Sequence, residues 1–312
     1  MTRYSTALLL LAACFMQACG LGPGVAQEGG GAELRVTRDF GQQLLDSATA
    51  EDVRPGDTVM RFLRSENPEV KTTYGGRFLQ SLDGLEGGGS GGGVDWFFYV
   101  NGQQGGSSAA DTRLYPGDVV QWDYRDWQGA MDIFAIVGAY PEPFVHGAEG
   151  KKYPTKVACV DPEGEACKTV KEALTKEGVI ATGAPLDAPA GDATLRVIVG
   201  AYPDLVDLRA AQPLADTPQT SGVFARFVEN GGAMELLDQT GKVVDRAESL
   251  SGLVAATAQP GDAPTWFITG LDDTGVLAAA RSLDPKILQD RFAVAITPGK
   301  TVALPVEPDA GG

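Results

Sequence analysis

The chain has 312 residues, of which 43% are hydrophobic and 21% charged, and this size and composition are typical of a globular protein with two domains. The formal net charge of −16 would repel the phosphates of nucleic acids and of anionic lipid head groups, so we expect no nucleic-acid partner. The acidity favours a surface that keeps the protein soluble outside the cell.

The N-terminus predicts export from the cytoplasm. Arg3 precedes an apolar run from Ala7 to Met16, which is typical of a secretion signal and too short to span a bilayer as a mature helix. Together with Cys19, the run resembles a bacterial lipoprotein signal, in which a cysteine receives a diacylglycerol before cleavage directly in front of it. The resemblance implies a signal peptide over residues 1–18 and an extracytoplasmic protein that a lipid anchors to the cell membrane.

Two cysteines compete for the lipid. Cys14 ends the better local match, LAAC, but it would leave an apolar run of only seven residues. Cys19, which ends MQAC, leaves a run of the usual length, so we favour Cys19 as the lipidation site. An ordinary secretory signal without a lipid is the alternative. Residues 19–31 are rich in glycine and have no periodicity, so they predict a flexible tether.

Regular structure is expected from about Ala32. The segment ELRVTRDF alternates apolar and polar side chains as a half-buried strand does, and GQQLLDSA after it is the expected hairpin partner. The segment PGDTVMRFLRSE predicts a helix, with Asp57 as its N-terminal cap and an apolar face of Val59, Phe62 and Leu63. A short strand, RFLQSL, and a glycine-rich loop, EGGGSGGG, follow the helix.

Two aromatic strands complete the first domain. The segments DWFFYVNG and DVVQWDYRDW are joined by a loop that ends in Pro116-Gly117, which a type II turn requires, so the second strand should begin at Asp118 or Val119. The order strand, strand, helix, strand, strand, strand is that of a β-grasp, a mixed sheet wrapped across one helix. We therefore predict an α+β domain of β-grasp type over residues 32–130.

Three motifs in this domain carry a resemblance to a known family. DTVMRFLRSENPEVKTTYGGRFLQSLDGL, WFFYVNG and LYPGDVVQWDY resemble the successive motifs of a bacterial β-grasp family, domain of unknown function 4430, which is related to the C-terminal domain of transcobalamin. The resemblance covers about residues 32–127. In transcobalamins this domain closes over a corrinoid that a separate helical domain holds, and this sequence contains no such helical domain. The resemblance implies a corrinoid or another small planar molecule as the ligand.

Residues 131–305 predict a layered α/β domain with a mixed sheet, followed by a frayed tail over residues 306–312. PTKVACVDPEGEACKTVKEAL and PTWFITGLDDTGVLAAARSL each run from a strand through an acidic turn into a helix. Between them, GVFARFVENGGAMELLDQTGKVVDRA predicts an antiparallel meander, and FAVAI is expected to be the last strand. The hexapeptide IVGAYP occurs at residues 136–141 and 198–203, and we expect it to end a strand each time.

Cys159 and Cys167 are expected to form a local disulfide. Outside the cytoplasm they meet an oxidising environment, and Pro162 and Gly164 between them can fold the chain back. A zinc site is excluded because the only histidine is His146 and no second cysteine pair lies nearby.

The sequence favours a protein that is not an enzyme and needs no cofactor. His146, the only imidazole base, lies in a loop without a nucleophile motif, and the glycine runs lack the residues of a phosphate-binding loop. Asp272 or Asp273 is expected to cap a helix rather than to line a crevice. A hydrolase that uses paired carboxylates stays open, since the 41 acidic residues contain no signature that selects two of them.

The aromatic strands raise the question of what covers them. Alternation places Trp96 and Phe98 on one face and Phe97 and Tyr99 on the other, and a single helix can cover only one face. The second face therefore meets the second domain, a partner chain or a ligand. The residues predicted for ligand binding are Tyr99, Asn101, Trp122, Tyr124 and Trp127. For Asn101 the alternative is a turn residue that tolerates a positive φ before Gly102.

These patterns predict a membrane-anchored extracytoplasmic lipoprotein that binds a small ligand without catalysis, and that delivers it to a transporter. The alternative is a structural or adhesion module of the cell envelope that binds protein or polysaccharide. An exposed aromatic patch would favour that module, whereas a closed pocket would favour a small molecule.

Overall fold

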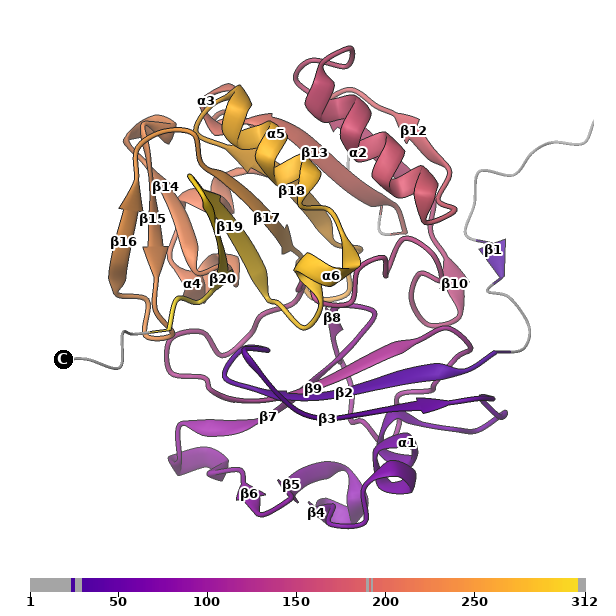
Figure 1. Ribbon diagram of the computed structural model, residues 1–312. Helices are drawn as coiled ribbons and strands as arrows, with labels where there is room; N and C mark the ends of the chain where they lie inside the picture. The colour runs from indigo at the N-terminus through magenta and orange to yellow at the C-terminus, as the bar shows by residue number, and fades with distance from the viewer. Residues whose placement is uncertain (1–23, 26–29, 189–190, 192, 308–312) are drawn as a thin grey trace, which may run out of the picture.

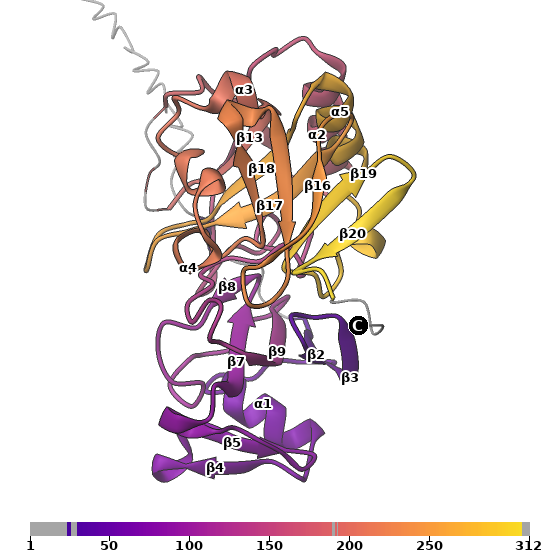
Figure 2. The same ribbon diagram turned by 90° about the vertical axis from the view of Figure 1, so that its left-hand side faces the viewer.

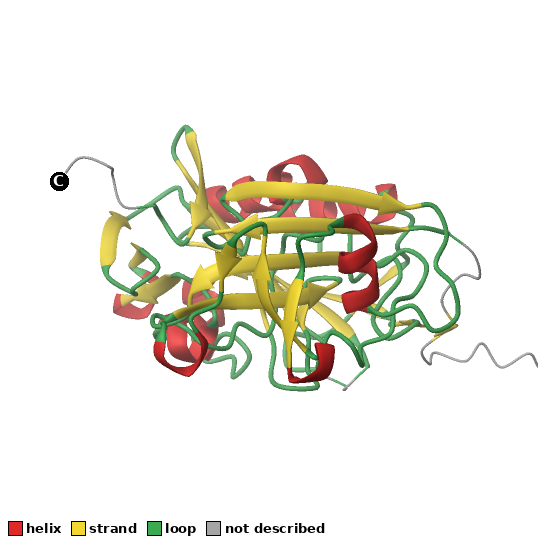
Figure 3. Ribbon diagram, turned by 90° about the horizontal axis from the view of Figure 1, so that it is seen from below, coloured by secondary structure: helices red, strands yellow, loops and turns green. Residues whose placement is uncertain are grey.

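The computed structural model describes residues 24–25, 30–188, 191 and 193–307. The predicted signal peptide, the lipidation site Cys19, its competitor Cys14 and most of the tether and tail lie outside the described residues. The described chain forms two units that lie one above the other in Figure 1, with the N-terminal unit below. Strands make up most of the regular structure, as Figure 3 shows.

The N-terminal unit contains the predicted β-grasp sheet. Its strands are β2 Ala32–Arg38, β3 Gln43–Ala50, β7 Val94–Val100, β8 Gln103–Gln104 and β9 Val119–Asp126. They lie in the order β3-β2-β9-β7-β8, in which β2 and β9 are parallel and the other pairs antiparallel. The carbonyl of Tyr115 accepts a hydrogen bond of 3.1 Å from the amide of Asp118, and Gly117 has φ +87°, as the predicted type II turn requires. The last long strand begins at Val119, as expected.

The helix of this unit, α1 Val59–Glu66, buries the predicted Val59, Phe62 and Leu63. Its cap is not Asp57 but the next residue, Thr58, whose hydroxyl accepts from the amide of Arg61 at 3.3 Å. Asp57 lies one position too early and accepts from the amide of Arg54 at 2.8 Å instead.

The predicted strand RFLQSL does not join the main sheet. It forms β5 Phe78–Leu82, which pairs only with β4 Lys71–Thr73 and β6 Leu85–Glu86 in a small separate sheet. Leu79 and Leu82 of this small sheet are buried in the same core cluster as α1 and Trp122. The small sheet and α1 therefore cover one face of the β-grasp sheet together (Figure 2). Two short 3-10 helices, η1 Tyr74–Gly76 and η2 Gly89–Gly91, lie in the loops.

The C-terminal unit is built on the predicted mixed sheet, in the order β12-β11-β13-β18-β17-β19-β20. Strands β12, β11, β13 and β18 are parallel, and the remaining pairs are antiparallel. The strands are β11 Thr155–Cys159, β12 Ala181–Gly183, β13 Leu195–Ala201, β17 Gly252–Thr257, β18 Thr265–Gly270, β19 Ala293–Thr297 and β20 Lys300–Leu304. A minor pair, β1 Gly24–Val25 and β10 Lys151–Lys152, lies beside it.

Three layers make up this unit. Helices α2 Glu165–Lys176 and α5 Asp273–Arg281 pack on one face of the sheet, and the predicted meander covers the other. The meander strands are β14 Ala225–Val228, β15 Ala233–Leu237 and β16 Val243–Ala247. Asp272 caps α5 by accepting from the amide of Gly275, as expected. Short helices α3 Tyr202–Leu205, η3 Gln212–Ala215, α4 Pro218–Ser221, η4 Glu229–Gly231 and α6 Pro285–Leu288 complete the unit.

Two predicted strand assignments are wrong. The first IVGAYP copy, residues 136–141, is not a strand but part of the connection between the units, where the amide of Ile136 donates to Gly102 of the N-terminal unit and that of Val137 donates to Phe292 of the C-terminal unit. Its apolar side chains are buried by this junction rather than by a sheet. FAVAI forms β19, but β20 follows it as the last strand.

Candidate functional site

The aromatic residues on the helix-facing side of the sheet form a core. Trp122 is buried, and its ring lies 5.1 Å from that of Phe98, centroid to centroid. Tyr124 is half-buried, and its hydroxyl donates to the carbonyl of Glu86 at 2.8 Å. Trp127 is half-buried at the end of β9. Of these side chains, Phe98, Trp122 and Tyr124 pack in the core cluster under α1 and the small sheet.

The opposite face of the sheet packs against the C-terminal unit. Tyr99 has no exposed surface, and its ring lies 5.4 Å from that of Phe292. Arg125, also fully buried, lies 3.7 Å above the ring of Phe97 and donates to the Tyr99 hydroxyl at 3.3 Å. Burial raises the pKa of Tyr99 well above its ordinary value. Of the covers that the sequence left open for this face, the second unit is the one that packs on it.

Buried polar groups hold the β2–β3 turn of the N-terminal unit in place at the junction with the C-terminal unit. Asp123 is fully buried and accepts from the Thr37 hydroxyl at 2.6 Å and from the amides of Phe40 and Gly41 at 3.1 and 2.8 Å. Across the junction, the Nε of Arg35 donates to Asp290 at 2.8 Å, and a Cβ added at Gly41 would lie 1.7 Å from the Asp290 carbonyl oxygen. This close approach leaves no space for a ligand between the hairpin turn and Asp290.

Asn101 has a structural position. It is fully buried with φ +52°, as the turn alternative expects, and its side chain donates to Asp118 and to the carbonyl of Gly147, each at 2.8 Å. Burial raises the pKa of Asp118 to about 6. The side chain of Glu142 hydrogen-bonds His146 and raises the pKa of that imidazole. This cluster joins the turn before β9 to the connection between the units.

The five residues predicted for ligand binding therefore do not come together. Tyr99 lies on one face of the sheet, Trp122 and Tyr124 lie on the other, and Asn101 is enclosed by the turn. None of the five lines the large cavity that the described residues form.

That cavity lies in the C-terminal unit and has a volume of about 830 Å³, within the range of small-molecule sites. Its base is the edge of the seven-stranded sheet where the parallel strands β13 and β18 begin and β17 ends. The rest of the lining comes from three segments, residues 186–188, 208–220 and 258–263. Several residues of each segment line the cavity. Ligands of α/β sheets commonly bind at the carboxyl ends of the parallel strands. This cavity instead lies at the amino ends of β13 and β18.

A row of polar side chains crosses the base of the cavity. Arg196 on β13 pairs with Thr265 on β18, and Thr265 pairs with Thr257 on β17. Residues directly opposite each other on neighbouring strands share a face of the sheet, so the three side chains lie on the same face. All three line the cavity. Lys156 on β11 extends the row on the far side of Arg196.

Arg196 is the most unusual group in the cavity. Arg196 is only 7% exposed, and this burial lowers the pKa of its guanidinium below the ordinary value. Its Nη1 donates to the carbonyl of Ala188 at 2.8 Å. Its Nε has no hydrogen-bond partner, and no carboxylate of the described residues lies within ion-pair distance. A guanidinium stays protonated even when buried, so the positive charge at the base of this cavity is not neutralised by the described residues.

The sequence contained a sign of this residue that we did not use. ATLRVIVG is a run of apolar residues interrupted by one arginine, and such a run predicts a strand buried on both faces. A charged residue in a fully buried strand requires a partner or a ligand. The sequence could therefore have identified Arg196, but not the segments that enclose it.

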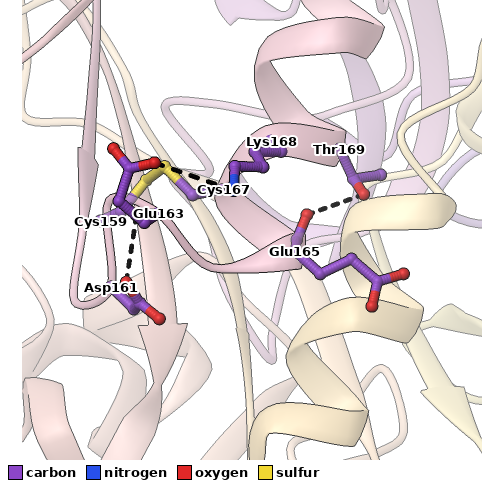
Figure 4. Close-up of a disulfide and its surroundings, with 7 residues drawn as sticks. All are labelled: Cys159, Asp161, Glu163, Glu165, Cys167, Lys168 and Thr169. Atoms are coloured by element: carbon purple, nitrogen blue, oxygen red, sulfur yellow. Dashed lines mark hydrogen bonds and ion pairs between the residues drawn. A yellow bond between two sulfur atoms is a disulfide. The ribbon is translucent and has the colours of Figure 1, made fainter.

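The predicted disulfide is present. Cys159 at the end of β11 and Cys167 in the first turns of α2 are bonded, with their Cα atoms 6.0 Å apart, and Figure 4 shows the acidic loop that the bond closes. Within that loop Glu163 forms an ion pair of 3.8 Å with Lys168. The bond joins the strand to the helix and lies outside the cavity lining.

Neither a metal centre nor a membrane span is found in the described part of the chain. Its His, Cys, Asp and Glu side chains form no group of three or more that could hold a metal ion. Of the helices in residues 24–25, 30–188, 191 and 193–307, none has both the length and the apolar character needed to cross a bilayer.

Comparison with known proteins gives one family. Residues 56–126 match the model of "Domain of unknown function (DUF4430)", a stretch that runs from just before α1 to the end of β9. The matched stretch lies within the N-terminal unit. No curated protein matches the chain. A crystal structure of "a putative metal binding protein" from Ruminococcus gnavus is similar over 31% of this chain and 97% of that chain, with 16% sequence identity and a TM-score of 0.24.

Proposed function

We propose that the protein is a non-catalytic binding protein that holds a small ligand in the cavity of its C-terminal unit. The observation that supports the proposal is a cavity of about 830 Å³ with the buried, unneutralised Arg196 at its base. Such a group costs stability in the empty protein, and a ligand that pairs with it would remove that cost. The N-terminal unit then serves as a rigid platform, since its second aromatic face is used for the junction.

We further propose that the protein is extracytoplasmic and attached to the cell membrane through a lipid on Cys19. The N-terminal sequence and the disulfide between Cys159 and Cys167 support this location, because disulfides persist in oxidising compartments. Delivery of the ligand to a membrane transporter would suit such a tether. Labelling with radioactive palmitate tests the anchor: we expect the label on the wild type and on Cys14→Ala and no label on Cys19→Ala. Label that survives in the double variant Cys14→Ala/Cys19→Ala would contradict a lipid at either cysteine.

The cavity is tested by closing it. Ala210 is half-buried in the wall, and Ala210→Trp would fill the space above the sheet edge. We expect native mass spectrometry of the wild type, incubated with a mixed library of small metabolites that includes cobalamin, to detect a retained molecule that Ala210→Trp does not retain. Retention of a molecule by both proteins, or by neither, would contradict a site in this cavity. Cobalamin retained by both the wild type and Ala210→Trp would indicate a corrinoid site in the N-terminal unit.

One observation favours the second candidate, an adhesion or structural module of the envelope. Tyr74 in η1 and Phe78 at the start of β5 are 81% and 61% exposed, and their rings lie 5.6 Å apart. The small sheet that contains β5 lies on the side of the N-terminal unit away from the C-terminal unit (Figure 1). Exposed aromatic rings bind protein or sugar surfaces. Pull-down with isolated cell-envelope polysaccharide, comparing the wild type with Tyr74→Ala/Phe78→Ala, tests this role. Equal recovery of both proteins would argue against it.

A further inference from the structure

We infer that the ligand of the cavity is a small molecule with a single carboxylate, which pairs with Arg196, and with a neutral or cationic remainder that faces the mouth. The inference rests on the proposed function of the cavity and adds the chemical class of its ligand. It is carried by three observations: the missing partner of Arg196, the hydroxyl groups beside it and the charge around the mouth.

Two half-buried arginines of the described chain, Arg35 and Arg226, have a carboxylate partner that Arg196 lacks. Arg35 pairs with Asp290, and Arg226 pairs with Glu235 at 2.6 Å. Arg125 lies over an aromatic ring and donates to the carbonyl of Met131 at 3.2 Å. The buried Arg125 also has two nitrogens without a hydrogen-bond partner, but it is enclosed by aromatic rings and does not line the cavity. Arg196 has one carbonyl, that of Ala188, and this accounts for one of its five N–H donors. A buried guanidinium with free donors on a cavity wall is a site for an anion, and its fork matches either a carboxylate or a phosphate. The charge at the mouth of the cavity decides between these two anions.

The neighbours of Arg196 fit a carboxylate as well. Thr257 and Thr265 lie beside it in the polar row, and their hydroxyl groups can donate to a carboxylate oxygen. The apolar atoms of Leu186, Leu208 and Ala210 in the walls would contact the remainder of the ligand. A few placed polar groups in a partly apolar cavity are typical of small-molecule sites.

The charge at the mouth selects against a second anionic group. Asp187, Asp216 and Asp262 are exposed lining residues, whereas Arg209 is the exposed cation among them. The mouth therefore carries more negative than positive charge, and it would repel a phosphate or the far carboxylate of a diacid. A neutral tail is accepted there, and an ammonium group is favoured. An amino acid has both of the groups that this arrangement matches.

The experiment measures the thermal unfolding of the purified full-length protein with four probes at equal ionic strength: acetate, leucine, succinate and inorganic phosphate. A ligand that binds only the folded state raises the melting temperature with its concentration. We expect leucine to raise it most, acetate to raise it less, and succinate and phosphate to leave it near the value in chloride. A larger shift with phosphate or succinate than with leucine would overturn the single-carboxylate inference, and so would no shift with any probe.

Two arginine variants separate the role of the guanidinium from a general effect of charge. Arg196→Met should abolish the shift with leucine and raise the melting temperature of the ligand-free protein by about 2–4 °C, because it removes a buried charge without a partner. Arg196→Gln serves as a second variant if the methionine protein does not fold. The matched control, Arg64→Met, removes an exposed arginine of α1 that does not line the cavity, and it should keep the shift. A leucine shift that survives in both Arg196 variants would overturn the inference.

The two sets of variants distinguish a failure of the carboxylate inference from a failure of the proposed binding function. If a neutral metabolite is retained by the wild type, lost in Ala210→Trp and still retained by Arg196→Met, the cavity binds small molecules but the carboxylate inference is wrong. If nothing depends on Ala210, the proposed function itself fails.

Discussion

Asp123 holds the β2–β3 turn, which carries Phe40 into the junction of the two units. Its carboxylate is fully buried and receives hydrogen bonds from one hydroxyl and two backbone amides. Asp123→Ala would leave these three donors buried without an acceptor, and each such donor costs on the order of 1 kcal/mol or more. We expect the free energy of unfolding to fall by about 3 kcal/mol, measured by urea denaturation.

Asp126 provides the control for this change. It lies on the same strand, and its carboxylate accepts one exposed hydrogen bond, from the amide of Gln128. We expect Asp126→Ala to cost less than about 1 kcal/mol. Equal losses for the two alanine variants would show that burial of the Asp123 network does not stabilise the junction.

Asp118 makes the stability depend on pH. Burial raises its pKa from 3.8 to about 6 in the folded protein, so the folded state holds this proton more tightly than the unfolded chain does. Its stabilisation is complete below pH 3.8 and is lost as the pH rises through about 6. We expect the wild type to lose on the order of 3 kcal/mol across this window from Asp118.

Asp118→Asn isolates this contribution, because asparagine does not titrate. Burial also raises the pKa of Asp123, and the Glu142 side chain raises the pKa of His146. Both groups change the stability with pH in the same direction as Asp118, and both are present in the wild type and in the variant. Urea unfolding between pH 4 and pH 7 should therefore give a steeper decline for the wild type than for the variant. Parallel curves would mean that Asp118 does not titrate in this range.

At the scale of elements, the disulfide is the strongest local restraint on the strand-to-helix loop. The residues Cys159 and Cys167 are nearly buried and join β11 to α2 across a sequence separation of 8. A loop this short is expected to contribute roughly 2–3 kcal/mol by restricting the unfolded chain. Cys159→Ala/Cys167→Ala should lose that amount in urea unfolding under non-reducing conditions.

The control for the disulfide is the reductant. Wild-type protein unfolded in the presence of a strong reductant should approach the stability of the double variant, whereas the variant should not respond. A variant as stable as the oxidised wild type would contradict the restraint. Mass spectrometry of the non-reduced wild type should find the two cysteines cross-linked.

Turn chemistry explains which elements could be predicted. Pro116-Gly117 identified the turn before β9, and the same dipeptide, Pro298-Gly299, separates β19 from β20, where Gly299 has φ +76°. The first dipeptide was used and the second was not, so β20 was missed although its evidence was present in the sequence. The error at residues 136–141 has another cause. An apolar run buried by two separate units has the same pattern as one buried in a sheet.

The candidate site was predictable only in part. Alternation correctly separated Tyr99 from Trp96 and Phe98, but it did not show that Trp122 lies on the face opposite Tyr99. It also could not show which surface covers Tyr99, because that depends on the packing of residues nearly 200 positions apart, such as Phe292. The cavity around Arg196 is formed by segments from residues 186 to 265, and no local pattern brings them together. Local periodicity therefore predicts elements and faces, whereas a cavity is a property of the packed chain.

At the scale of the whole molecule, the two units behave as one body because they share a core. Phe40, in the turn between β2 and β3, is 1% exposed, and its ring lies 5.0 Å from Phe224 and 5.3 Å from Phe292. Tyr99 and Ile133 belong to the same cluster as the meander residues of the C-terminal unit. An apolar, tightly packed junction resists relative motion, so the N-terminal unit holds the C-terminal unit in a fixed orientation.

This shared core predicts a single unfolding transition. In scanning calorimetry, the van't Hoff enthalpy of the wild type should equal the calorimetric enthalpy, as for one cooperative body. Phe40→Ala removes the ring at the centre of the junction, and we expect it to cost about 3–5 kcal/mol and to divide the transition in two. Phe78→Ala, at a ring 61% exposed, should cost less than about 1 kcal/mol and keep one transition. Two transitions in the wild type would mean that the units unfold independently, and the junction would then not explain why the second aromatic face is apolar.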